Sequence, residues 1–121
     1  MTASEEIFEV KSVEHADNII KAVLSINADS PIFQGHFQGQ PVVPGACMLQ
    51  VVKNVLTDAL GYAIQLKKGD SLKFVGMIIP GAAGVVSVEI NYKVMEDAIC
   101  VNAKLSEVDR VCFKFRGTFV R

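Results

Sequence analysis

The sequence predicts an α+β domain in which one long helix is followed by a run of antiparallel strands. Residues 45–60 repeat apolar side chains at the spacing of a helix, whereas residues 86–115 alternate apolar and polar side chains as strands do. Short turns at 95–97 and 107–109 join these strands, and connections this short belong to antiparallel pairs. A chain of 121 residues suits a single core, so residues 1–121 are expected to form one domain.

Two segments before the helix are expected to join the sheet. Ile7–Val13 is apolar-rich and predicts a strand or an irregular edge, and Glu14–Asn18 follows as a turn. His15 lies among acidic neighbours in that turn, which favours a solvated loop histidine. Ile19–Asn27 alternates and predicts a half-buried strand, with the inner face formed by Ile20, Ala22, Leu24 and Ile26 and with Lys21, Ser25 and Asn27 on the other face.

Gly45–Leu60 predicts an amphipathic helix with Gly61 as its C-terminal cap. The apolar face contains Met48, Val52, Val55, Leu56 and Ala59, widened by Cys47 and Val51. The opposite stripe is polar and contains Gln50, Lys53, Asn54 and Thr57. Because β-branched valines are mediocre helix formers, we expect packing against a sheet to stabilise this helix.

Four strands are expected after the helix. Ser71–Ile79 would place Leu72, Phe74 and Ile78 on one face. The next two strands alternate most clearly, with inner faces formed by Val86, Val88, Ile90, Tyr92 and Val94, and by Ile99, Val101, Ala103 and Leu105. The last strand begins with Val111, Phe113 and Phe115, and Gly117 is expected to form a bulge.

Composition narrows the functional classes. The net charge is −1, with 12 basic and 13 acidic residues and no basic cluster in the sequence, so neither a nucleic-acid nor a membrane partner is expected. No apolar run could span a bilayer, and the acidic Glu5-Glu6 start is unlike a signal peptide. Three cysteines without metal-binding spacing favour free thiols in a cytoplasmic protein, with no metal and no cofactor.

The stretch from Phe33 to Gln50 is the strongest candidate for a functional site. Its glycines and prolines fix a tight loop that contains His36, and Pro44-Gly45 opens the helix. The unpaired N–H groups of a helix's first turn suit an oxygen that gains negative charge, and a nearby imidazole could take a proton from the adjacent carbon. The alternative is a loop histidine that only hydrogen-bonds the turn.

This stretch resembles the 3-hydroxyacyl-acyl carrier protein dehydratases of the hot-dog fold. Their motif is Gly-His-Phe-Pro-Gly-x-Pro-x-x-Pro-Gly, followed by a catalytic Glu or Asp fourteen residues after the His. Seven motif positions match, namely Gly35, His36, Phe37, Gly39, Pro41, Pro44 and Gly45. Two positions depart from the motif: Gln38 replaces a proline, and Gln50 replaces the catalytic acid.

The resemblance implies a curled antiparallel sheet around one central helix, and removal of water from a 3-hydroxyacyl thioester carried by acyl carrier protein or coenzyme A. It assigns proton abstraction to His36, thioester binding to the Gly45 N–H and orientation of the imidazole to the Val42 carbonyl. Phe37 and Cys47 would line the substrate site. It also implies a cis bond between His36 and Phe37, and a homodimer or higher oligomer with sites shared between chains.

Two positions keep alternative interpretations. An amide cannot deliver a proton, so Gln50 could only hold the leaving hydroxyl or a water by hydrogen bonds. The alternative is that Gln50 is a solvated helix position. Cys47 is either a core residue or a thiol whose pKa is lowered at the helix N-terminus. The function is accordingly a dehydratase, or else a catalytically silent module that binds acyl thioesters or supports an active partner. A thioesterase is less favoured, because hot-dog thioesterases also need a carboxylate.

Overall fold

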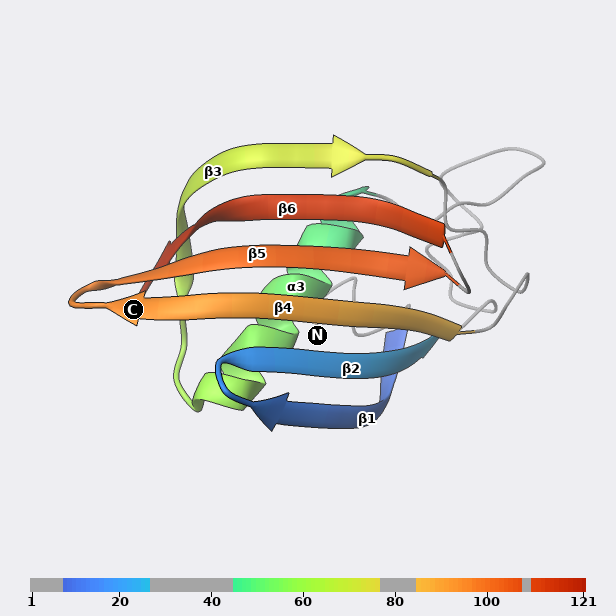
Figure 1. Cartoon of the computed structure of the whole chain (residues 1–121), viewed down its shortest axis with the longest axis horizontal. Helices are drawn as coiled ribbons and strands as arrows, with labels where there is room; N and C mark the ends of the chain where they lie inside the picture. The colour runs from blue at the N-terminus through green and yellow to red at the C-terminus, as the bar shows by residue number, and fades with distance from the viewer. Residues whose placement is uncertain (1–7, 27–44, 77–84, 108–109) are drawn as a thin grey trace.

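The computed structural model describes residues 8–26, 45–76, 85–107 and 110–121. It contains one helix, α3 (Gly45–Leu60), and one six-stranded antiparallel sheet that curls around it (Figure 1). The strand order is β1-β2-β4-β5-β6-β3, so β1 and β3 form the two edges. The strands are β1 (Phe8–Ala16), β2 (Ile19–Ile26), β3 (Gln65–Phe74), β4 (Val85–Met95), β5 (Ala98–Glu107) and β6 (Arg110–Val120).

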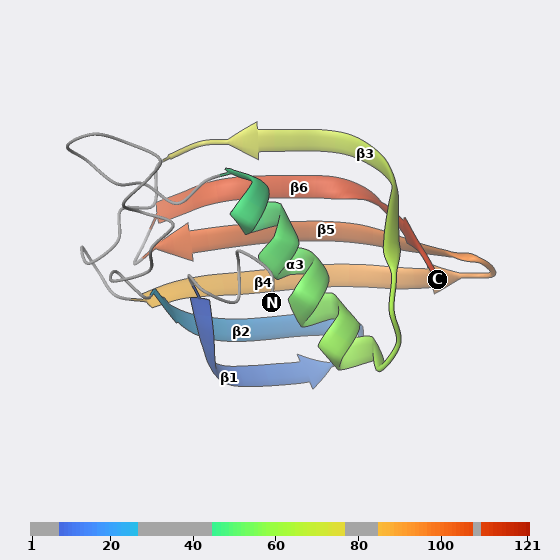
Figure 2. The same ribbon diagram turned by 180° about the vertical axis from the view of Figure 1, so that it is seen from behind.

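Helix α3 lies diagonally across the inner face of the sheet (Figure 2), where its apolar stripe is buried. Val52 and Leu56 are 0% exposed, which confirms the predicted face. The helix ends as predicted at Gly61, whose φ of 84° is in the left-handed region and whose N–H donates to the Thr57 carbonyl at 2.9 Å. Within the described ranges, α3 is too short to cross a membrane.

The central strands confirm the predicted alternation. The inner faces of β2, β4 and β5 supply most of the core opposite α3. Their buried residues are Ile20, Ala22, Leu24, Val86, Val88, Ile90, Ile99, Val101, Ala103 and Leu105. Val94 departs from the prediction, because it is 52% exposed near the β4–β5 hairpin, beyond the helix.

The prediction of a turn at Glu14–Asn18 is wrong in its bounds. Strand β1 continues through Ala16, and the turn consists of Asp17 and Asn18, whose φ angles are 53° and 63°. Asp and Asn tolerate this left-handed conformation better than other residues with a side chain. His15 therefore lies in a strand, exposed, with Nε2 at 2.6 Å from the Tyr92 hydroxyl.

Strand β3 begins at Gln65, six residues before the predicted start at Ser71. Its first half, Gln65–Asp70, has no apolar alternation, and its pairing with β6 extends it. Leu72 and Phe74 share one face as predicted, because they pair with the buried Phe115 and Phe113 of β6. They are nevertheless 45% and 59% exposed, since β3 is an edge strand. Ile78 lies outside the described residues.

Gly117 is a regular ladder position and not the predicted bulge. It pairs with Val101 on one side and Gly69 on the other, and the register shifts lie in the facing β3, around Lys67 and Asp70. A Cβ at Gly117 would lie 2.5 Å from the Lys68 carbonyl oxygen. The glycine is thus required by the close approach of β3.

Candidate functional site

The described part of the candidate site is the N-terminal half of α3. His36, Phe37, Val42 and the bond between His36 and Phe37 lie outside the described residues. Gly45 is the first residue of α3, and N–H groups in a helix's first turn have no intrahelical acceptor. The helix N-terminus that the motif predicts is therefore present at its predicted position.

Gln50 is half-buried and its amide is held by another helix residue. Its Nε2 donates to Asn54 Oδ1 at 2.9 Å, one turn further along α3. Residues four apart lie on one helix face, so this pair fixes the Gln50 amide along the helix axis. The pair presents hydrogen-bond donors and acceptors but contains no group that releases a proton at neutral pH.

A groove of about 290 Å³ runs between β1 and α3, and Asn54 of this pair lines it. Its walls include the apolar Val10, Val51 and Val55, while polar groups come from three residues of α3, namely Asn54, Thr57 and the exposed carboxylate Asp58. Apolar walls with a few polar groups are typical of sites that bind acyl chains or other small ligands. The sequence pattern placed Asn54 and Thr57 on a polar stripe, but only the packing of β1 shows that they line a groove.

Cys47 is buried, 5% exposed, and burial raises the pKa of its thiol. A neutral thiol packs as a small apolar group, which supports a core or wall position over a reactive one. Cys47, Cys100 and Cys112 are all free thiols. In the part of the chain that the structure describes, no three His, Cys, Asp or Glu side chains gather as metal ligands.

Glu107 is a buried carboxylate, although the sequence pattern predicts a turn at this position. It ends β5 on the inner face, 8% exposed, and its Oε1 accepts a hydrogen bond from Arg110 Nη2 at 3.1 Å. Within the described residues, its Oε2 has no hydrogen-bond partner. The alternation of Val101, Ala103 and Leu105 continues to Glu107, which is the signal that could have placed it inside.

Comparison with known proteins gives two kinds of relative. The bifunctional enzyme LpxC/FabZ of Porphyromonas gingivalis is 32% identical over 59% of this chain and 17% of that one. The 3-hydroxyacyl-[acyl-carrier-protein] dehydratase FabZ of Haemophilus influenzae strain PittEE is 27% identical over 64% of this chain and 55% of that one. The chain thus spans about half the length of this FabZ relative and under a fifth of the bifunctional enzyme.

Solved structures confirm the predicted hot-dog fold. The dehydratase heterocomplex ApeI:P from Xenorhabdus doucetiae superposes with a TM-score of 0.77 at 19% identity, over 94% of this chain and 98% of that one. The PaaI protein of Escherichia coli superposes with a TM-score of 0.69 at 11% identity, over 94% of this chain and 82% of that one. At such identities the likeness concerns the fold. The family model described as ApeI dehydratase matches residues 12–96, and the chain therefore belongs to the ApeI-like dehydratase family.

Proposed function

We propose that this protein removes water from (3R)-hydroxyacyl thioesters to give trans-2-enoyl thioesters, in fatty acid synthesis or a related acyl-chain pathway. One observation carries the proposal: seven positions of the dehydratase motif match in residues 35–45 of the sequence, whose last residue is the first of α3, in a chain of a dehydratase family. The acyl group is carried by acyl carrier protein or coenzyme A. The protein acts as one cytoplasmic domain.

In this proposal His36 takes the proton from the carbon next to the thioester carbonyl. The electrons of that C–H bond move onto the thioester oxygen, which the N–H of Gly45 and the helix N-terminus stabilise. The Val42 carbonyl orients the imidazole, and Phe37 and Cys47 line the acyl site. As the C–O bond breaks, the electrons on the thioester oxygen return to form the carbon–carbon double bond, and the hydroxyl leaves as water with a proton from solvent, because Gln50 holds the hydroxyl but cannot protonate it. His36 then releases the proton it took to solvent.

A homodimer is proposed because β3 leaves one edge open. Among the described strands, β3 pairs only with β6, and Leu72, Phe74 and the following Val75 are 45%, 59% and 59% exposed. An open edge strand is a template for pairing with another chain, and the last part of β3 adds exposed apolar side chains to it. A second copy offers the same edge, and two antiparallel copies would extend the sheet. His36 would then lie nearer the partner's Gln50 than its own.

The second candidate function is a silent acyl-thioester-binding module or the supporting member of a heterodimer. The pairing of Gln50 with Asn54 favours it, because the helix face that would carry the acid bears two amides instead. The structurally similar Xenorhabdus protein is itself described as a heterocomplex. A thioesterase is less favoured, since it would also need a carboxylate.

Turnover of 3-hydroxyacyl thioesters of several chain lengths tests the proposal. His36→Ala should abolish activity, and Gln50→Glu should raise it about 10- to 1,000-fold, within the range that a general acid contributes. Gln65→Glu makes the same isosteric change at the exposed start of β3 and should leave the rate unchanged. If Gln50→Glu binds the thioesters and turns over no faster than the wild type, the dehydratase proposal is wrong and the binding role remains.

A further inference from the structure

A row of charged residues crosses the outer face of the sheet, on the side away from α3. Residues paired across neighbouring strands share a face, and this row takes one residue from each strand. In sheet order it contains Glu14, Lys21, Glu89, Lys104, Lys114 and Lys73. The first four alternate in sign, whereas the last two repeat the positive charge of Lys104.

The alternating part of the row is internally compensated. Lys104 Nζ lies 3.3 Å from Glu89 Oε2, and Lys21 is paired in register with both Glu14 and Glu89. Opposite charges directly across a ladder stabilise a sheet, and like charges destabilise it. Lys114 has a lysine on each side, and neither Lys114 nor Lys73 forms an ion pair with another described residue.

The uncompensated end of the row lines a hollow of about 460 Å³. Arg116, in the neighbouring row, adds a fourth positive charge, and Ser71 and Asn102 pair with it in register and also line the hollow. Glu89, at the margin, is paired with Lys104, so the uncompensated charges of the hollow are those of Lys73, Lys114 and Arg116. The hollow therefore offers several positive charges and neutral hydrogen-bonding groups to an anionic partner.

We infer that this surface, centred on Lys73, Lys104 and Lys114, docks an acidic helix of a partner protein. Neighbouring strands are about 4.8 Å apart, so the three lysines span about 10 Å in a line. Carboxylates at positions i, i+4 and i+7 of a helix lie on one face and span about 10 Å along its axis. The carboxylates of such a helix would supply the negative charges that the lysine end of the row lacks within the sheet.

Two other anionic partners fit this surface less well. A phosphate group is best held by donors that converge on one point, whereas these lysines stand in a line. A nucleic acid would extend past the hollow, where Glu14 lies in the same row and the chain carries a net charge of −1. The test therefore includes competition by a phosphate compound and by a nucleic acid.

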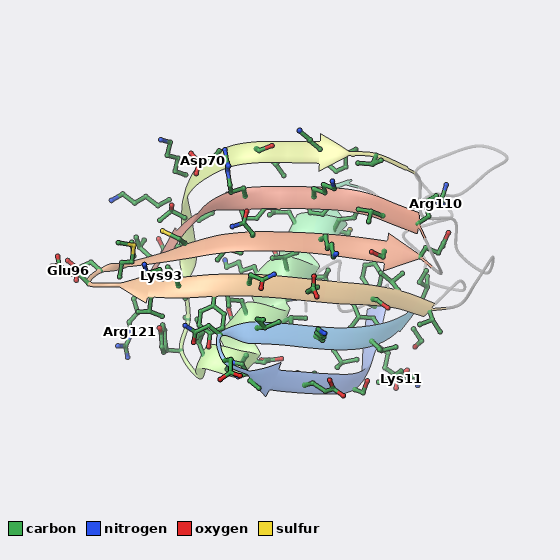
Figure 3. All side chains as sticks on the ribbon, in the orientation of Figure 1. Lys11, Asp70, Lys93, Glu96, Arg110 and Arg121 are labelled. Atoms are coloured by element: carbon green, nitrogen blue, oxygen red, sulfur yellow. The ribbon has the colours of Figure 1, made fainter. Side chains whose placement is uncertain are left out.

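The test uses a fluorescent alanine-rich helical peptide with glutamates at i, i+4 and i+7, and a twin with glutamines there. The wild-type protein should bind the glutamate peptide, measured by anisotropy, and lose binding as salt rises from about 20 mM to about 300 mM. Lys114→Glu should weaken binding at least about tenfold, because it places like charges together. Lys93→Glu is the matched control on the outer face, at the far end of β4 near the β4–β5 hairpin (Figure 3), and should not weaken binding.

Three results would overturn the inference: equal binding of the glutamine twin, equal weakening by Lys93→Glu, or displacement of the peptide by equimolar pyrophosphate or single-stranded RNA. The melting temperature of each variant shows that it is folded, so lost binding is not lost structure. The surface lies on the side of the sheet opposite α3, so dehydratase activity should be the same in all of these variants. The docking inference and the proposed function can therefore fail separately.

Discussion

Replacing Lys114 by glutamate should make the fold more stable, an unusual outcome for a charge reversal. Lys114 lies between Lys104 and Lys73 in register, so the change turns two like-charge pairs into two opposite-charge pairs. The geometry for such pairs exists in the next ladder, where Lys104 and Glu89 approach to 3.3 Å with side chains 47% and 33% exposed. Lysine and glutamate are both depleted in strands, so the change in intrinsic preference is small.

The expected gain is about 1 kcal/mol, taking about 0.3 kcal/mol for each exposed repulsion removed or attraction added. For a domain of this size that corresponds to a rise in melting temperature of about 4 °C. The assay is thermal and urea unfolding at low salt and in about 1 M NaCl, where the gain should disappear through screening. Lys93→Glu is the control, because Lys93 pairs with the uncharged Cys100 in the ladder between β4 and β5.

A destabilised Lys114→Glu variant, or a gain that persists in high salt, would refute the electrostatic argument. A stabilised variant that also loses the acidic peptide would mean that Lys114 is retained for binding at a cost in stability. This combination separates a docking surface from a solvated face, because a solvated face would gain stability and lose nothing.

Three further predictions concern packing and thiol reactivity. Gly117→Ala should destabilise the fold by about 1–3 kcal/mol in urea unfolding, because its Cβ would lie 2.5 Å from both the Lys68 carbonyl oxygen and Phe115 Cζ; an unchanged midpoint would contradict this close packing. Leu56→Ala, at a fully buried position on α3, should cost about 2–5 kcal/mol in the same assay. At pH 8 a thiol reagent should label exposed Cys100 before Cys47, whose raised pKa lowers its thiolate fraction; equal labelling rates in the folded protein would contradict the burial.

The elements predicted best from the sequence are those whose pattern and packing agree. Helix α3 and strands β4 and β5 each bury one face against the same core, so their apolar periodicity is strong. The first half of β3 gave no such signal, because Gln65–Asp70 is polar and exposed. Its strand conformation comes from the ladder with β6, a long-range pairing that local pattern does not reveal.

The cationic surface likewise depends on long-range strand pairing, which the sequence pattern does not reveal. The sequence has no basic cluster, because Lys73, Lys104 and Lys114 are separated along the chain and none has a basic run around it. Only the register of β5, β6 and β3 brings them side by side. Charge patterning in an antiparallel sheet is therefore informative only after the strand order is known.

Position 50, where the family motif has a catalytic acid, can be understood only from the sequence and the structure together. The motif spacing identifies Gln50 as the departure from the family, and the structure adds that its amide is tied to Asn54 at 2.9 Å. A glutamate at position 50 could keep this contact if the Asn54 amide turned its NH₂ group toward the new carboxylate. That hydrogen bond would favour the charged form and lower the pKa of the new acid, while the partial burial of position 50 would raise it. The strength of the restored acid would thus depend on Asn54 as well as on residue 50, and adding Asn54→Ala to Gln50→Glu should move the pH profile of dehydration toward higher pH.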